Sequence, residues 1–125
     1  MDRAGVAAWV GRYEQAWRTE GTATLAELFT ADASYRTSPW AEPIEGLGAI
    51  QGMWEAERQG PHEDFAMVSE VVAVEGDTAV VRVEVVYRYQ GGIRWRDLWV
   101  VRFASDGRCA AFEEWPFAPG QDDGH

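Results

Sequence analysis

The stretch IRWRDLWVVRFASDGRCAAFEEWPF, residues 93–117, decides the fold. It contains two runs with the alternating apolar pattern of strands, joined at Asp106-Gly107, a dipeptide typical of two-residue hairpin turns. Counting outward from that turn predicts three pairs on one face of the sheet: Phe103 with Ala110, Val101 with Phe112, and Trp99 with Glu114. This face is large and apolar with one carboxylate, Glu114, set into it. We interpret the carboxylate as the polar end of a pocket.

The chain is acidic and rich in aromatic residues, with 125 residues, a formal net charge of −10 and seven tryptophans. All 11 basic residues are arginine. An acidic chain with scattered arginines repels phosphate backbones, so we expect no nucleic-acid partner. Cys109 is the only cysteine, which favours a reducing cytoplasm. No window approaches the roughly 20 apolar residues of a membrane span and the N-terminus lacks a signal-peptide pattern, so we expect no membrane association.

Upstream of the hairpin, the pattern predicts three helices followed by strands. Apolar residues at three- and four-residue steps from Val6 to Trp17 predict an amphipathic helix. Thr24 and Glu27 have the spacing of a capping box that opens a short second helix. A third helix is expected over 46–59, and strands over 33–37, 65–74 and 78–89. This order predicts an α+β fold with three N-terminal helices packed on a mostly antiparallel sheet, in a single domain over residues 1–119 with a flexible tail over 120–125.

The connection at Gly91-Gly92 leaves two strand registers open. A strict two-residue turn sets Tyr87 opposite Arg96 and mixes aromatic and arginine side chains on one face. A longer loop or a bulge keeps the apolar faces together, and we expect this second register. It pairs Tyr87 with Asp97 and Val85 with Trp99.

The chain resembles the SnoaL-like and ketosteroid isomerase-like branch of the nuclear transport factor 2-like superfamily. The resemblance is carried by RYEQAW (12–17), LAELFTADASY (25–35), EPIEGLGAI (42–50) and RWRDLWVVRFASDGRCAAFEEW (94–115). It implies a cone, in which a strongly bent sheet surrounds a cavity and the long first helix closes one side. It also implies a homodimer formed through the outer face of the sheet. The superfamily includes isomerases, cyclases, hydrolases, dehydratases and non-catalytic proteins, so the resemblance leaves the reaction open.

The isomerase chemistry of this branch carries over only in part. Its helical tyrosine falls on Tyr13, but its general base falls on Thr37 and its protonated aspartic acid on Trp99. Ketosteroid isomerisation itself is therefore not expected. Epoxide hydrolases of the superfamily require one arginine and two aspartates. Glu114 falls near one of the aspartates, and Arg82 and Glu84 near the other two positions, but strand alternation directs Arg82 and Glu84 outward.

We expect Glu114, Asp97 and Tyr13 to carry any chemistry. Burial of Glu114 among aromatic side chains should raise its pKa, as a proton-transferring carboxyl requires; alternatively, it accepts a hydrogen bond from the Trp99 indole. Asp97 is a second pocket carboxylate if the longer connection holds, or else the partner of a neighbouring arginine. Tyr13 donates to a ligand, or bonds one of the two carboxyl groups instead.

We expect the pocket to be lined by aromatic and apolar residues, namely Trp17, Tyr35, Thr37, Trp54, Phe65, Val83, Val85, Tyr87, Trp95, Trp99, Val101 and Phe112. We expect no metal, because two scattered histidines and one cysteine cannot form a standard site, and His62 is interpreted as a surface residue. We expect no cofactor, because no nucleotide-binding fingerprint is present.

Two hypotheses follow. The first is a cofactor-independent acid–base enzyme, of the isomerase, cyclase, dehydratase or epoxide hydrolase type, acting on a small apolar molecule that is aromatic or polycyclic. The second is a non-catalytic small-molecule binder or dimeric scaffold of the same fold. An open cavity with an inward Glu114 favours the enzyme, whereas a cone filled by tryptophans favours the second hypothesis.

Overall fold

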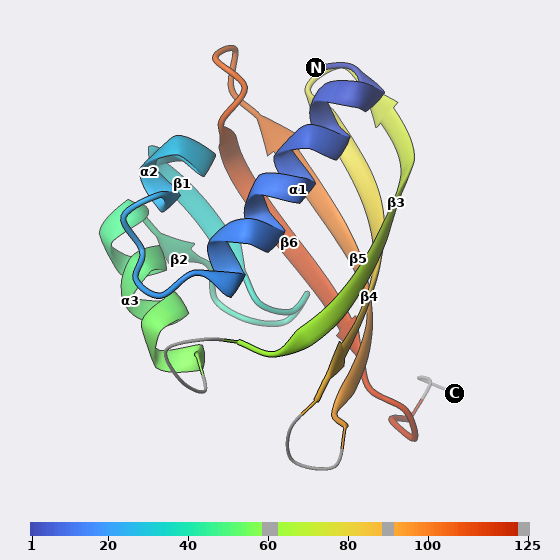
Figure 1. Ribbon diagram of the computed structural model, residues 1–125. Coiled ribbons are helices and arrows are strands. Elements are labelled where there is room, and N and C mark those ends of the chain that lie inside the picture. The colour runs from blue at the N-terminus through green and yellow to red at the C-terminus, as the bar shows by residue number, and fades with distance from the viewer. Residues whose placement is uncertain (59–62, 89–91, 123–125) are drawn as a thin grey trace.

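Three helices pack against a six-stranded sheet that is curled but not closed (Figure 1). This computed structural model describes residues 1–58, 63–88 and 92–122. The elements are α1 (Arg3–Arg18), α2 (Leu25–Leu28), β1 (Phe29–Arg36), β2 (Ile44–Glu45), α3 (Leu47–Glu57), β3 (Phe65–Glu75), β4 (Thr78–Tyr87), β5 (Arg94–Phe103) and β6 (Cys109–Phe117). The strand order is β2-β1-β6-β5-β4-β3, with only the β1–β6 pair parallel among these strands. The expected α+β fold with a bent, mostly antiparallel sheet is confirmed.

Several expected positions lie outside this description, including the last residue of the helix expected over 46–59 and of the strand expected over 78–89. The surface position expected for His62 lies outside the described residues, as do positions 123–125 of the expected tail. Within the described ranges, no helix combines the length and the apolar character needed to cross a bilayer.

Helix α1 lies diagonally across the inner face of the sheet and supplies much of the core (Figure 1). Its first turn is capped by Asp2, whose carboxylate accepts a 2.7 Å hydrogen bond from the Gly5 amide. Trp9 is fully buried, and its indole N–H donates to the Leu28 carbonyl at 3.0 Å. The edge-on contact of its ring with Phe103, 5.5 Å between centroids, ties the helix to β5 as well.

The second helix and the first strand differ from the prediction. Helix α2 is a single turn, and the backbone of Thr24 is already helical, with φ −83° and ψ −7°. Its side chain makes no capping hydrogen bond, so the predicted capping box is wrong. Strand β1 follows directly at Phe29 and is longer than the predicted 33–37. Helix α3 ends at Glu57, two residues before the predicted end.

The β5–β6 hairpin follows the predicted pairing except at its turn. Two of the three predicted pairs are confirmed: Val101 with Phe112, and Trp99 with Glu114. Phe103 pairs with Cys109 rather than with Ala110. The two-residue turn is wrong because the Ala104 amide bonds the Arg108 carbonyl at 2.8 Å, which makes a wider turn with a bulge at its base.

The β4–β5 pairing corrects both registers considered for the 91–92 connection. Val85 pairs with Trp95 and Val83 with Asp97, so the expected partners of Val85 and Asp97 are wrong. The Tyr87 amide instead bonds the Ile93 carbonyl at 2.8 Å. The observed register differs from the expected one by four residues along β5. An even displacement leaves side chains on the same face, so Asp97 still lies on the inner side although its expected partner was wrong.

Gly46 joins the sheet to α3. Its φ of +93° and ψ of 150° lie in a region that residues with a side chain rarely adopt. Its amide donates to the Ala33 carbonyl at 2.8 Å, and its carbonyl accepts from the Ile50 amide at 3.0 Å. The helix that follows forms despite Gly52 because Ile50 and Trp54 are fully buried.

We therefore predict opposite effects for two glycine-to-alanine changes. Gly46→Ala should lower the free energy of unfolding by about 1–3 kcal/mol, because alanine strains this backbone, although the added Cβ would lie an ordinary 3.8 Å from the Ala31 carbonyl oxygen. Gly52→Ala meets no atom within 4 Å and should stabilise the helix by roughly 0.5–1 kcal/mol. Urea unfolding measures both, and effects of equal sign would contradict the assignment.

Candidate active site

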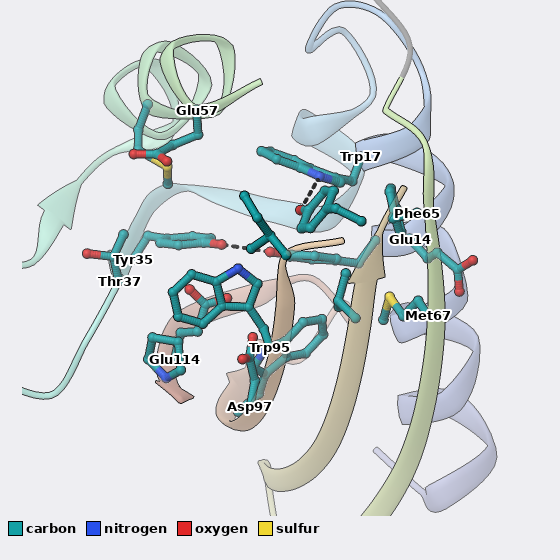
Figure 2. Close-up of a pocket in the computed structure, with 17 residues that line it drawn as sticks. Glu14, Trp17, Tyr35, Thr37, Glu57, Phe65, Met67, Trp95, Asp97 and Glu114 are labelled. Atoms are coloured by element: carbon teal, nitrogen blue, oxygen red, sulfur yellow. Dashed lines mark hydrogen bonds between the residues drawn. The ribbon is translucent and has the colours of Figure 1, made fainter. Parts of the chain in front are cut away.

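A cavity of about 410 Å³ opens between α1, α3 and the inner face of the sheet (Figure 2). It is lined by Tyr13, Glu14, Trp17, Tyr35, Thr37, Met53, Glu57, Phe65, Met67, Val85, Tyr87, Ile93, Trp95, Asp97, Trp99, Glu114 and Pro116. The structure therefore brings together the three residues expected to carry chemistry. It also brings eight of the expected lining residues to the cavity: Trp17, Tyr35, Thr37, Phe65, Val85, Tyr87, Trp95 and Trp99.

Four expected lining residues do not reach the cavity: Trp54, Val83, Val101 and Phe112. Phe112 is stacked under Tyr13 and Tyr35, with ring centroids 5.5 and 4.5 Å away. Trp54 is covered by Tyr13 at 5.0 Å and by Trp17 at 4.8 Å. Val83 and Val101 are fully buried in the same core. Strand alternation identified the inner face correctly but could not tell which part of it α1 covers.

The strand register explains why Asp97 and Glu114 meet. Asp97 is opposite Pro116, and Glu114 is opposite Trp99, so the two carboxylates are diagonal neighbours on the inner face of β5 and β6. Side chains at such diagonal positions are within reach of one another. Both are partly buried, and both line the cavity, where Figure 2 shows them on the same side as Trp95.

Burial and mutual repulsion give the two carboxyl groups different pKa values, both above the ordinary range. Burial raises the pKa of Asp97 to about 6, an increase that the nearby Trp99 indole and Glu114 partly offset. Burial raises the pKa of Glu114 further, to about 8, and the charges of Asp97 and then Glu57 add to this effect. The two groups titrate as a pair, which retains one proton near neutral pH.

The alternative partners considered for the two carboxylates were the Trp99 indole and a neighbouring arginine. The buried Trp99 indole N–H lies near both carboxyl groups and lowers their pKa values, as the alternative for Glu114 implied, but it does not meet the geometry of an ordinary hydrogen bond with any described residue. Asp97 Oδ1 is likewise buried without a partner within the described ranges. Arg96, one candidate partner of Asp97, instead pairs with Glu84 at 3.0 Å on the outer face.

Tyrosine hydroxyls border the cavity on the side of α1. The hydroxyls of Tyr13 and Tyr35 are hydrogen-bonded at 2.7 Å, and the Trp17 indole N–H donates to the Tyr87 hydroxyl at 3.1 Å (Figure 2). Burial raises the pKa of Tyr13 and of Tyr35 well above 10, so both remain neutral. Tyr13 thus bonds a tyrosine rather than either of the carboxyl groups considered from sequence.

Several cavity residues were not anticipated: Glu14, Met53, Glu57, Met67, Ile93 and Pro116. Helical spacing could have identified Glu57, which is three residues after the buried Trp54 and four after Met53. Glu14 is paired with Arg18 at 2.8 Å. Among the described residues, no group of three or more His, Cys, Asp and Glu side chains is arranged to hold a metal ion.

Solved structures with the same fold include three proteins of less than 25% identity. One is a candidate SnoaL-like polyketide cyclase from Jannaschia sp. CCS1, with a TM-score of 0.74 and 19% identity, over 93% of this chain and 90% of that one. Another is SalBIII, an epoxide hydrolase/cyclase-like enzyme of pyran ring formation in the polyether salinomycin, with a TM-score of 0.71 and 12% identity, over 92% and 89%. The third is a candidate ketosteroid isomerase from Parabacteroides distasonis ATCC 8503, with a TM-score of 0.62 and 20% identity, over 88% and 86%.

Sequence comparison gives the family directly. No curated protein matches the chain significantly. The profile described as SnoaL-like domain, however, matches residues 10–112, which span α1 to the middle of β6 and include Tyr13 and Asp97. With most of its length matched, and with the α+β architecture of three helices on a curled sheet described above, this chain belongs to the SnoaL-like family of the nuclear transport factor 2-like superfamily.

Proposed function

We propose that this chain is a cofactor-independent enzyme that transfers protons on a small apolar molecule, with Asp97 and Glu114 as its acid–base pair. The observation that carries the proposal is that two interacting carboxyl groups share the wall of an aromatic cavity. Active sites are where such burial and like-charge pairing are used to raise pKa values. Descriptions of the similar structures as isomerase, cyclase and epoxide hydrolase/cyclase-like agree with this class of chemistry.

The order of the two pKa values assigns the roles. Asp97 has the lower pKa, so near neutral pH it is the carboxylate and acts as the base, while Glu114 keeps its proton and acts as the acid. Asp97 removes a proton from a carbon or hydroxyl of the ligand. Glu114 supplies one to the oxygen that becomes negative. Isomerisation, dehydration, ring closure and epoxide opening all share this pattern.

The tyrosine pair is suited to stabilise the developing oxyanion. In a bond between two hydroxyls, one proton is used in the bond and the other remains for a further acceptor. The Tyr13–Tyr35 pair therefore offers one O–H to a ligand oxygen, whichever hydroxyl donates to the other. Both groups stay neutral, as a donor to an oxyanion must.

Two better-defined reactions of the superfamily lack residues here. Thr37 borders the cavity but cannot serve as the base of a ketosteroid isomerase, and Trp99 stands where its protonated acid would be. Arg82 is on the outer face, paired with Glu70 at 3.0 Å, so the arginine of the epoxide hydrolase arrangement is not at the carboxylates. We therefore propose a proton-transfer enzyme whose catalytic residues differ from those of both the ketosteroid isomerases and the epoxide hydrolases.

The alternative function is a non-catalytic binder of the same apolar ligand. The mutual bond of Tyr13 and Tyr35 is equally consistent with it, because the one O–H that this bond leaves free can hold a ligand oxygen without any reaction. The paired carboxyl groups favour the enzyme, because burying both costs stability that a simple binder has no reason to lose.

We also propose that the chain forms a homodimer through the outer face of the sheet. Large apolar side chains are exposed there, with Val68 at 68% and Phe117 at 47% of their surface, together with Val86, Leu98 and Trp115. Ion pairs between Arg82 and Glu70 and between Arg96 and Glu84 lie among them. A self-complementary patch of this kind suits an isologous interface.

The catalytic proposal predicts measurable carbon deprotonation. The probe is 5-nitrobenzisoxazole, a small aromatic compound that a general base opens to a coloured phenolate by removing one C–H proton. Asp97→Asn should lower the protein-catalysed rate by roughly 10²–10⁴-fold. The rate should be bell-shaped in pH, with limbs near the pair's pKa values of about 6 and 8. Asp64→Asn, which changes an exposed carboxylate, is the matched control. A wild-type rate no higher than that of Asp97→Asn would support the binder instead.

Stability should fall with rising pH on account of Glu114. Its pKa is raised on folding from an ordinary 4.5 to about 8, so the stabilising protonated form is fully present below about 4.5 and is lost as the pH rises through about 8. Glu114→Gln should remove this loss, on the order of several kcal/mol at most. Urea unfolding at several pH values compares it with wild type and with Glu42→Gln, an exposed control. Parallel wild-type and Glu114→Gln curves would show that Glu114 is solvated.

The dimer proposal predicts twice the 14.0 kDa chain mass by light scattering at micromolar concentration. Leu98→Asp adds a charge to the middle of the outer face and should shift the mass to that of the monomer without unfolding the chain, because Leu98 is already 38% exposed. A monomer mass for the wild type at this concentration would count against the interface. So would an unchanged dimer mass for the variant.

A further inference from the structure

The Trp99 indole lies beside both carboxyl groups because of its position in the sheet. Asp97 and Trp99 are two residues apart on β5, so their side chains leave the same face. Glu114 is directly opposite Trp99 on β6. Two alternate residues of one strand and the cross-strand neighbour of the second form a triangle of adjacent side chains. All three residues line the cavity.

The ring of Trp99 is held in place by packing. Only 2% of the residue is exposed. Its ring contacts those of Tyr13 and Phe112, with centroids 4.6 and 5.0 Å away. Because these contacts come from both α1 and β6, the indole has little freedom to turn away from the carboxyl groups. Its N–H is therefore fixed beside the pair before any ligand binds.

The indole N–H acts on both carboxyl groups at once. It lowers the pKa of Asp97 and that of Glu114, which means that it stabilises the ionised form of each. It does not have the geometry of an ordinary hydrogen bond with either group. This is the behaviour of one donor near two acceptors that compete for it, since a shared hydrogen bond is less direct to each acceptor.

A donor near both carboxyl groups suits a reaction in which the negative charge moves between them. At the start of the proposed reaction Asp97 is ionised and Glu114 holds the proton. Once Asp97 has taken a proton from the ligand and Glu114 has given its own, the charge is on Glu114. The pair has gained one proton and lost one. A proton passing from Asp97 to Glu114, which contact each other directly, restores the starting state.

We propose that Trp99 is a positioning residue of the carboxyl pair, and that its single N–H stabilises whichever of Asp97 and Glu114 is ionised during turnover. The inference deepens the proposed function and rests on it. Trp99 acts through the two carboxyl groups and does not itself transfer a proton, because its indole N–H is a donor only.

Other titratable groups face the pair from four neighbouring elements: Tyr13 and Glu14 on α1, Tyr35 on β1, Glu57 on α3, and Tyr87 on β4. Burial raises the pKa of all three tyrosines, to about 12 for Tyr87, so they stay neutral while the pair titrates. The charge of Glu57 raises the pKa of Glu114, and Glu14 is paired with Arg18. A substitution at Trp99 leaves all of these groups in place, so their effects are common to the proteins compared.

Carbon NMR of isotope-labelled side-chain carboxyl groups tests the proposal without a substrate. The wild-type pair should titrate with pKa values of about 6 and about 8. Trp99→Phe keeps an aromatic ring but removes the N–H, so the lower pKa should rise by about one unit. The upper pKa should rise less, because the donor already serves one carboxylate when the second ionises. Trp95→Phe, the same change at a cavity residue on the other side of Asp97 along β5, is the matched control and should leave both values unchanged.

The direction of the change separates loss of the donor from loss of packing. Water that enters the space left by the smaller phenylalanine ring would lower both pKa values, because burial is what raises them. Unchanged or lowered pKa values in folded Trp99→Phe would therefore overturn the proposal.

A measurement on the wild type covers the case in which Trp99→Phe does not fold. The proton–nitrogen resonance of the Trp99 indole, assigned through its contacts with the Tyr13 and Phe112 rings, should shift in both titration steps. The Trp9 indole donates to the Leu28 carbonyl at 3.0 Å, so its resonance should stay constant as an internal control. A Trp99 resonance that follows only one step, or neither, would show that the N–H does not serve both groups.

The pH dependence of benzisoxazole opening connects this role to the proposed function. In Trp99→Phe the low-pH limb of the rate should move upward with the lower pKa, whereas a purely structural role would lower the rate at every pH and leave the limb in place. If the pKa values respond to Trp99 but opening does not depend on Asp97, the placement of the N–H stands and the proposed chemistry fails. If opening depends on Asp97 but neither NMR measurement responds, the proposed chemistry stands and the role of Trp99 fails.

Discussion

The packing of α1 across the inner face of the bent sheet determines the rest of the structure. A curled sheet has a concave apolar face that must be covered, and a single helix of 16 residues covers only part of it. Trp9 and Tyr13 fill the covered half through ring contacts with Phe112 at 6.3 and 5.5 Å. Beyond Tyr13 the helix contacts the sheet through Trp17 at β4 and Arg18 at β3, and the part of the inner face that these residues leave uncovered forms the wall of the cavity.

The same packing sets the electrostatics of the site. Asp97 and Glu114 are on the boundary between the filled and open halves, where aromatic side chains exclude much of the water but an opening remains. Burying two carboxyl groups side by side opposes folding, since neither can be ionised without cost and no arginine compensates them at the cavity wall. One retained proton reduces that cost, and the same proton makes the pair chemically useful.

Strand alternation predicted from the sequence which residues lie on the inner face of the sheet. This assignment did not require the correct strand register. Trp99 with Glu114 followed from counting back from a tight turn; the turn is in fact wider, which makes the counted pair of Phe103 wrong, but the bulge beside Phe103 restores the counted register from Val101 onward. Asp97 was assigned to the right face with the wrong partner, because an even shift of register preserves the face. The Tyr13–Tyr35 bond was not predictable, because it joins a helix to a distant strand and depends on how α1 crosses the sheet.

The face of the sheet on which each side chain lies therefore decides the chemistry of this site. Along β4, Val81, Val83 and Val85 point inward while Arg82 and Glu84 point outward into ion pairs. A shift of β4 by one residue would exchange its inner and outer faces and bring an arginine to the carboxylates. A salt bridge would then replace the proton-sharing pair, and the pKa values of both carboxyl groups would be lowered rather than raised. Because no basic side chain among the described residues lines the cavity, the acid–base properties of Asp97 and Glu114 come from burial and from each other. The chemistry of the pair thus depends on the lack of arginine among the described cavity-lining residues as much as on the two carboxylates themselves.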